Sequence, residues 1–184
     1  RLYPLTHLLP KALLPVADKP LLVHNLEKLA AAGFREIGLV VNPQNREIFF
    51  KRLGNGERWD VNLTYLIQEQ PLGLAHAVQT GKQYLKDAHR FLVVLGDNLF
   101  GTDLKHFWTE YLASGTESQI MLIEVADPGN YGVAKLSGNR IIELIEKPAQ
   151  PESNCAVAGV YGFSQGVFNQ IEKLRPSFRG ELEL

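Results

Sequence analysis

The chain has 184 residues, is 45% hydrophobic and carries a formal net charge of −1 from 19 basic and 20 acidic residues. These totals predict one globular domain with a full core, and the lack of charged blocks or long apolar runs disfavours a nucleic-acid or membrane partner. The single cysteine, Cys155, rules out a disulfide framework within the chain and suits a reducing, cytoplasmic compartment.

The first twenty residues, RLYPLTHLLPKALLPVADKP, predict an extended loop. Four prolines interrupt this stretch, and each removes a backbone donor, fixes φ and drives the preceding residue out of the helical region. Arg1 and Lys11 are the only Lys or Arg residues among the first eighteen, which is typical of a wall around an anionic ligand. Because the chain starts on Arg1 without a methionine, we expect it to be truncated at this end.

Apolar periodicity in the rest of the chain predicts alternating helices and strands. Helices are expected at 20–33, 45–54, 73–85, 103–115 and 166–174, and strands at 36–41, 61–68, 91–98, 119–125 and 155–163, with a hairpin over 131–148. Asp103 is the expected N-cap of the fourth helix. The alternation predicts an α/β fold, with a doubly wound, mostly parallel sheet and antiparallel additions, in a single domain over 1–184.

Two polar positions follow predicted strands, and ligands of such sheets lie beyond the carboxyl ends of the strands. Asp97 could hold Mg²⁺, an ion that favours carboxylates and substrate phosphates, or it could simply begin an Asx turn. Gln68 could pair its amide with the edge of a base, or it could be a solvated strand end. Gly73, at the following helix start, would leave backbone donors free near Gln68.

A third candidate is the sequence IEKP, which closes the predicted hairpin. Glu146 could accept hydrogen bonds from sugar hydroxyls and Lys147 could bind a phosphate, or the two could form an unimportant surface ion pair. The five histidines show no metal-binding spacing, and neither a G-x-S-x-G elbow nor a complete G-x-G-x-x-G or P-loop is present. The sequence therefore gives no support to a metal site built on histidines or to a serine hydrolase.

Seven stretches, in order, are RLYPLT, PKALLPVADKP, QEQPLGLAHAV, LGDN, DPGNYGVAKL, EKPAQPESNCAVAGVY and PSFRGELE. Together they resemble the sugar-1-phosphate nucleotidylyltransferases, and within that family the glucose-1-phosphate thymidylyltransferases, over nearly the whole chain. The family's loop is G-x-G-T-R-L-x-P followed by P-K-x-L-L-P-V, of which RLYP and PKALLPV are present here. The resemblance implies a Rossmann-like nucleotidyltransferase domain that lacks the family's glycines before Arg1 and its second metal-binding aspartate beyond Leu184.

The resemblance also assigns roles by position. Arg1, Lys11 and Lys147 would be the catalytic residues, with Arg1 and Lys11 on the nucleotide phosphates and Lys147 on the sugar phosphate. Gln68 and the Gly73 backbone would read a pyrimidine, and Asp97 would lie at the nucleotide as the Mg²⁺ ligand. The implied sugar-phosphate subsite comprises Tyr131, Gly132, Glu146, Lys147, Val157 and Arg179.

The implied reaction is attack by a phosphate oxygen of glucose 1-phosphate on the α-phosphorus of dTTP, which gives dTDP-glucose and pyrophosphate. Such in-line chemistry asks the protein mainly for positioning and charge neutralisation. The family resemblance also implies a homo-oligomer.

Three alternatives remain open. A uridylyltransferase that makes UDP-glucose from UTP differs in its substrate by one methyl group, and Ala12, where thymidylyltransferases often have Gln, favours it. The sequences GLAHAV and DPGNYGV favour dTTP. The second alternative is a non-catalytic paralogue that binds a nucleotide sugar, although Asp97, Lys147 and Arg179 occur together. A dinucleotide-binding dehydrogenase would need a full glycine fingerprint.

Overall fold

The computed structural model describes residues 9–177 and 180–184. It opens with a short 3-10 helix, η2 (Lys11–Leu13), followed by an antiparallel pair of two-residue strands, β1 (Pro15–Val16) and β2 (Lys19–Pro20). The prediction of an extended loop is therefore wrong at Lys11–Leu13. Pro10 explains the difference, because its carbonyl accepts the Leu13 N–H at 2.8 Å and its fixed φ suits the residue before a helical turn.

A parallel pair of strands follows. Helix α1 (Leu21–Ala31) leads to β3 (Glu36–Val41), and α2 (Pro43–Leu53) connects β3 to its parallel neighbour β4 (Asn62–Ile67). Asn42 caps α2, since its Oδ1 accepts the Asn45 N–H at 2.8 Å. A second 3-10 helix, η3 (Glu57–Trp59), precedes β4. This unit confirms the predicted strand–helix–strand order.

The third sheet, after the β1–β2 and β3–β4 pairs, has five strands and antiparallel pairing. Its path runs β5 (Arg90–Val94), β9 (Cys155–Ser164), β7 (Gly132–Ser137) and β8 (Arg140–Glu146), and β6 (Ser118–Glu124) also pairs with β9. A 3-10 helix, η4 (Pro128–Asn130), enters β7, and the predicted hairpin is β7 with β8. The α/β class is thus confirmed, with antiparallel pairs taking a larger share than the alternating pattern suggested.

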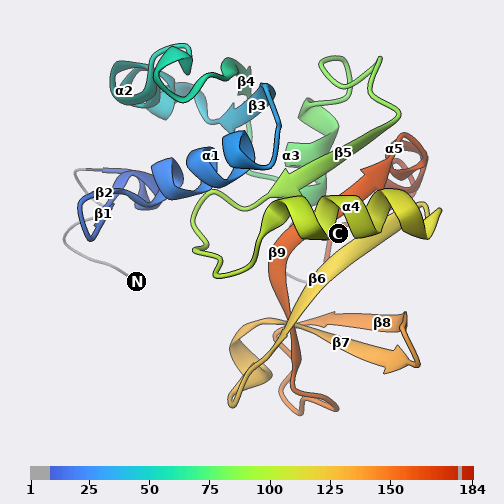
Figure 1. The fold of residues 1–184 in the computed structure, drawn as a ribbon. Helices are drawn as coiled ribbons and strands as arrows, with labels where there is room; N and C mark the ends of the chain where they lie inside the picture. Colours follow the sequence, from blue (N-terminus) through green and yellow to red (C-terminus); the bar gives the residue numbers. More distant parts are fainter. Residues whose placement is uncertain (1–8, 178–179) are drawn as a thin grey trace.

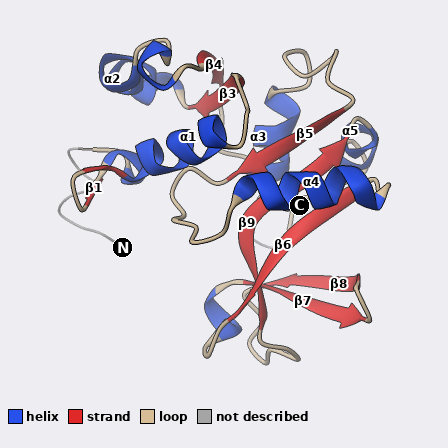
Figure 2. Ribbon diagram, in the orientation of Figure 1, coloured by secondary structure: helices blue, strands red, loops and turns tan. Residues whose placement is uncertain are grey.

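Strand β9 is buried on both faces. One face contributes Ala158 and Val160 to a core with α4 (Leu104–Ser114), and the other contributes Tyr161 and Phe163 to a core with α3 (Leu74–Thr80) and α5 (Gly166–Ile171). Figure 1 shows α4 crossing one side of β6 and β9, and Figure 2 shows the β7–β8 hairpin projecting beyond the helices. Strand β9 therefore connects the part of the fold that α3, α4 and α5 cover to the projecting hairpin.

A cavity of about 750 Å³ lies between β3 and β5. Leu22, Leu26 and Leu29 of α1 and Ala77 and Val78 of α3 line it, so most of its wall is apolar. Within residues 9–177 and 180–184, the facing edges of β3 and β5 have no strand partner. Gln68, directly after β4, and Asp97, in the loop after β5, are among the polar residues of the cavity lining. Among the described residues, no helix combines the length and apolar character needed to cross a membrane.

Candidate nucleotide and sugar-phosphate site

An ion pair between Lys11 and Asp97 lies at the end of the cavity where β5 ends. Lys11 Nζ lies 2.7 Å from Asp97 Oδ2, and the two side chains are 50% and 42% exposed. The 3-10 turn supplies Lys11, and the loop after β5 supplies Asp97. A Cβ on Gly96 would lie 3.2 Å from Leu22 Cδ1 and an ordinary 4.0 Å from Ala12 Cβ, so this loop lies against both α1 and the 3-10 turn. Since an exposed pair adds little stability, its importance is the placement of both charges at one opening.

Two asparagines fix the loop that carries Asp97. The Asn25 amide, in a side chain only 1% exposed, donates to the backbone oxygens of Asn98 at 2.8 Å and Leu95 at 3.3 Å. Asn98 Nδ2 in turn donates to Ala158 O at 2.9 Å, which ties the loop to β9. Sequence reasoning missed Asn25; its signal was a polar residue on the apolar face of α1, between Leu22 and Leu26.

Gln68 and Gly73 lie together beside the same cavity. Gln68 Nε2 donates to Gly73 O at 3.3 Å and lies 2.9 Å from His76 Nδ1, a contact that the sequence did not predict. Gly73 has a φ of 102°, and a Cβ there would lie 2.5 Å from Leu182 O. The backbone donors near Gly73 are not all free, because Ala75 N donates to Leu182 O at 3.0 Å.

The predicted sugar-binding residues converge at the base of the projecting hairpin. Gly132 pairs with Glu146 across β7 and β8, and a Cβ on Gly132 would lie 3.1 Å from Glu146 Oε2 and 3.5 Å from Val157 Cγ2. Tyr131 is 43% exposed, and its backbone oxygen accepts the Lys147 N–H at 2.9 Å. The missing side chain at Gly132 thus lets the Glu146 carboxylate pack closely against β7, beside Val157.

Lys147 occupies an unusual backbone conformation. Its φ is 47°, in the left-handed region that non-glycine residues rarely adopt, and its Nζ lies 3.4 Å from Glu146 Oε1. Strain of this kind persists only where the surroundings fix it, and it concentrates at functional sites. The conformation brings the ammonium group of Lys147 back beside Glu146.

The negative charge of Glu146 acts on the phenol of Tyr161, which is buried in the core. Burial, and to a smaller degree the negative charge of Glu146, raises the pKa of Tyr161 to about 12. Tyr161 is 7% exposed and stacks on Phe163 with ring centroids 5.8 Å apart. At neutral pH the phenol therefore stays protonated and neutral.

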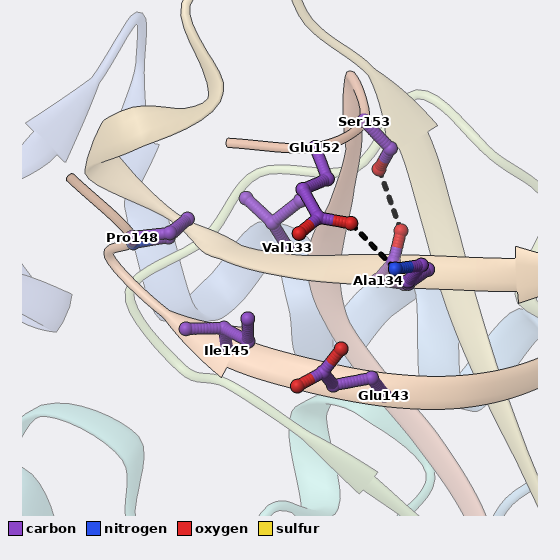
Figure 3. Close-up of a pocket in the computed structure, with 8 residues that line it drawn as sticks. Val133, Ala134, Glu143, Ile145, Pro148, Glu152 and Ser153 are labelled. Atoms are coloured by element: carbon purple, nitrogen blue, oxygen red, sulfur yellow. Dashed lines mark hydrogen bonds and ion pairs between the residues drawn. The ribbon is translucent and has the colours of Figure 1, made fainter. Parts of the chain in front are cut away.

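The loop that follows Lys147 is held by contacts around a small cavity. This cavity holds about 10 Å³, the space of roughly one water molecule, and lies between β7, β8 and residues 148–153 (Figure 3). Lys135 Nζ lies 2.5 Å from Glu152 Oε2, and Ser153 Oγ donates to Ala134 O at 2.6 Å. This pair lowers the pKa of the Glu152 carboxyl and raises that of Lys135. The cavity is too small for a substrate, so its contacts serve to anchor the loop.

The structure brings most predicted residues into two clusters. The first contains Asp97 and Gln68, which line one cavity, with their partners Lys11 and Gly73, and the second contains Tyr131, Gly132, Glu146, Lys147 and Val157. The hydrogen bond from Asn98 to Ala158 joins them, because Ala158 follows Val157 on β9. Arg1 and Arg179 lie outside the described residues.

A metal ion has one candidate ligand here. Within the described ranges, no three His, Cys, Asp or Glu side chains gather as a metal site. Magnesium, however, commonly uses only one or two carboxylates and completes its shell with water and substrate phosphates. The half-exposed carboxylate of Asp97, at the opening beside Lys11, fits an ion that arrives with a nucleotide.

The family model described as nucleotidyl transferase matches residues 1–184. The low-salt glycan biosynthesis nucleotidyltransferase Agl11 of Haloferax volcanii is 41% identical, and a glucose-1-phosphate thymidylyltransferase of Streptomyces griseus is 39% identical, each over 100% of this chain and 52% of the relative. The chain therefore spans about half the length of these curated relatives.

Two solved structures are also similar. A crystal structure from Bacillus anthracis, described as that of a glucose-1-phosphate thymidylyltransferase in complex with sucrose, matches with a TM-score of 0.89 and 34% identity over 97% of this chain and 72% of that one. A UDP-glucose pyrophosphorylase complexed with UDP-glucose matches with a TM-score of 0.85 and 26% identity over 100% of this chain and 78% of that one.

Proposed function

The chain belongs to the nucleotidyl transferase family, and from that premise we propose that its whole protein transfers a thymidylyl group from dTTP to glucose 1-phosphate. The products are dTDP-glucose and pyrophosphate. The observation that carries this proposal is the pairing of Lys11 with Asp97 at a cavity that Gln68 also lines. Lys11 supplies a cation that can bind phosphate, Asp97 a carboxylate that can bind a metal ion, and Gln68 an amide that can pair with a base.

The residues divide the work between the two substrates. Lys11, together with Arg1, neutralises the nucleotide phosphates, and Gln68 reads the base. Glu146, whose carboxylate packs against Gly132, accepts hydrogen bonds from the sugar hydroxyls, and Lys147 binds the sugar phosphate, with Arg179 as a second clamp. Mg²⁺, held by Asp97, would supply further neutralisation of phosphate charge.

In the transfer, a phosphate oxygen of glucose 1-phosphate forms a bond to the α-phosphorus of dTTP. The bond from that phosphorus to the bridging oxygen breaks, and the electron pair leaves with pyrophosphate. No side chain needs to become covalently attached. The protein contributes alignment of the two substrates and stabilisation of the phosphate charges.

A uridylyltransferase is the second candidate. Two observations favour it: the similarity to a UDP-glucose pyrophosphorylase at a TM-score of 0.85, and Ala12 beside Lys11 at the cavity. Thymine and uracil differ by one methyl group, which a pocket distinguishes by only about 1–3 kcal/mol.

The test is release of pyrophosphate by the whole protein with glucose 1-phosphate and Mg²⁺, using dTTP, UTP, ATP and GTP in parallel. We expect the highest kcat/KM with dTTP. A higher value with UTP would support the uridylyltransferase instead. Tight binding of dTDP-glucose by calorimetry without any release of pyrophosphate would overturn both proposals in favour of a non-catalytic binding protein.

A further inference from the structure

We propose that His76 is a positioning residue that orients the amide of Gln68, and that the site thereby selects bases that present a ring N–H. The substrate class is then a uracil or thymine nucleotide in preference to a cytosine nucleotide. This inference rests on the proposed function, in which Gln68 reads the base.

The orientation of Gln68 follows from its neighbours. A backbone carbonyl can only accept hydrogen bonds, so the Gln68 atom 3.3 Å from Gly73 O is the NH₂ group. The same nitrogen lies 2.9 Å from His76 Nδ1. Because Nε2 can only donate, Nδ1 must accept, which makes the imidazole neutral with its proton on Nε2.

These two contacts use both hydrogens of the Gln68 amide. The remaining polar atom is Oε1, to which no residue in the described ranges donates. Oε1 is an acceptor, so it pairs favourably with a ligand donor and unfavourably with a ligand acceptor. Uracil and thymine carry a hydrogen on N3, whereas N3 of cytosine is itself an acceptor.

His76 is held firmly enough to impose this orientation. It lies in α3 next to Ala75, which is fully buried and whose N–H donates to Leu182 O at 3.0 Å. The His76 carbonyl accepts from Thr80 Oγ1 at 2.9 Å. Gly73 O also accepts the Ala77 N–H at 3.1 Å, which keeps that carbonyl in place. A reversed Gln68 amide would set its oxygen against the Gly73 oxygen and lose the hydrogen bond to Nδ1.

Replacing His76 tests the role of its acceptor nitrogen, Nδ1. His76→Phe keeps a flat ring and removes the acceptor, whereas His76→Asn places an amide oxygen close to the position of Nδ1. His106→Phe is the matched control, because His106 lies on α4 with its side chain 69% exposed. The measured quantity is the ratio of kcat/KM for dTTP over dCTP, and for UTP over CTP, in the whole protein.

We expect the ratio to fall at least about tenfold in His76→Phe, through KM rather than kcat, because only the longer contact with Gly73 O, at 3.3 Å, then orients the amide. It should return to within about twofold of wild type in His76→Asn and stay unchanged in His106→Phe. Thermal melting confirms that each variant is folded.

Two outcomes would overturn the inference while leaving the proposed function intact: an unchanged ratio in His76→Phe, or a loss in His76→Asn as large as in His76→Phe. If the wild-type protein turns over neither dTTP nor UTP, the proposed function itself fails and the inference fails with it. If His76→Phe does not fold, the comparison of His76→Asn with wild type decides, since the inference requires the Asn variant to retain the ratio.

Discussion

Lys11 Nζ and Asp97 Oδ2 lie 2.7 Å apart although 86 residues separate them in the chain. Both side chains are about half exposed, and such pairs contribute only about 0–1 kcal/mol to stability. The contact is therefore easily exchanged for a better one. A triphosphate would attract Lys11, and a divalent cation would attract Asp97, so the ion pair holds both groups in place without competing strongly with substrates.

Lys11→Ala tests this reading directly. Loss of the ammonium group removes charge stabilisation from the nucleotide phosphates, and we expect turnover to fall by about 10²-fold or more. Stability should change little because the pair is exposed. Steady-state kinetics and urea denaturation measure the two effects separately.

Lys51→Ala is the matched control for this prediction. Lys51 pairs with Glu47 one turn away on α2, with a side chain 71% exposed, and this pair is absent from the cavity wall. We expect its turnover to match wild type. Near-normal turnover in Lys11→Ala would remove Lys11 from the catalytic machinery.

Lys147 allows backbone strain and charge to be separated. Its φ of 47° suits glycine, so Lys147→Gly relieves the strain while removing the ammonium group. We expect turnover to fall by about 10²-fold in both Lys147→Gly and Lys147→Ala. The glycine variant should be the more stable of the two in urea denaturation. Equal loss of folding in both would show that Lys147 has a structural role only.

Periodicity was sufficient for much of the fold. The apolar runs predicted β3, β4 and β9, and Asp103 caps α4 as expected, with its Oδ1 accepting the Lys105 N–H at 2.8 Å. These features depend on neighbours within a few residues. Helix α3 ends at Thr80 instead of continuing to 85, because Gly81 forms its C-terminal cap and is a weak helix former.

The order and direction in which the strands pair could not be predicted from such local patterns. Alternation of helices and strands suggested a mostly parallel sheet, yet β9 pairs antiparallel with β5, β6 and β7. Which strand lies next to which depends on contacts between residues up to about 70 positions apart, such as Val94 with Val160. A pattern with a period of two or 3.6 residues carries no information on that choice.

The candidate site likewise combines residues that the sequence predicted with residues that it did not. Asp97 and Gln68 were found because each follows the carboxyl end of a strand, where ligands of α/β proteins bind, although β5 and β4 belong to different sheets. Asn25 and His76 were not predicted, because each is an ordinary helix residue in the sequence. Each gains its role only from a loop that folding brings next to it.

Gly132→Ala tests the proposed sugar subsite. The added methyl group would lie 3.1 Å from Glu146 Oε2 and 3.5 Å from Val157 Cγ2, so the carboxylate proposed to bind the sugar would have to move. Gly132 has no left-handed φ, and the Glu146 oxygen ends a flexible side chain, so folding should survive. We expect KM for glucose 1-phosphate to rise about tenfold while KM for the nucleotide stays constant.

The control for this variant is Gly101→Ala, where an added Cβ meets no atom within 4 Å and φ is also ordinary. Its kinetics should match wild type. If Gly132→Ala raised both KM values equally, or neither, the subsite would lie elsewhere.

The pKa of Tyr161 predicts how stability depends on pH in alkali. The folded value of about 12 exceeds the ordinary value of 10.0, mainly through burial and secondarily through Glu146. A group that holds its proton more tightly when folded contributes stability that is complete below pH 10 and is lost as pH rises toward 12. Two units correspond to about 3 kcal/mol in the free energy of unfolding. Burial also raises the pKa of Tyr65, Tyr84 and Tyr111, so the chain as a whole should weaken over this range.

Tyr161→Phe isolates the contribution of this one phenol. The ring stays available for stacking on Phe163, so the free energy of unfolding at pH 8 should lie within about 1 kcal/mol of wild type. Between pH 9 and pH 11.5 the variant should lose distinctly less stability than wild type, as followed by urea denaturation at fixed ionic strength. Parallel curves for the two proteins would mean that Tyr161 titrates near its ordinary pKa, and that neither burial nor the charge of Glu146 acts on the phenol as the structure indicates.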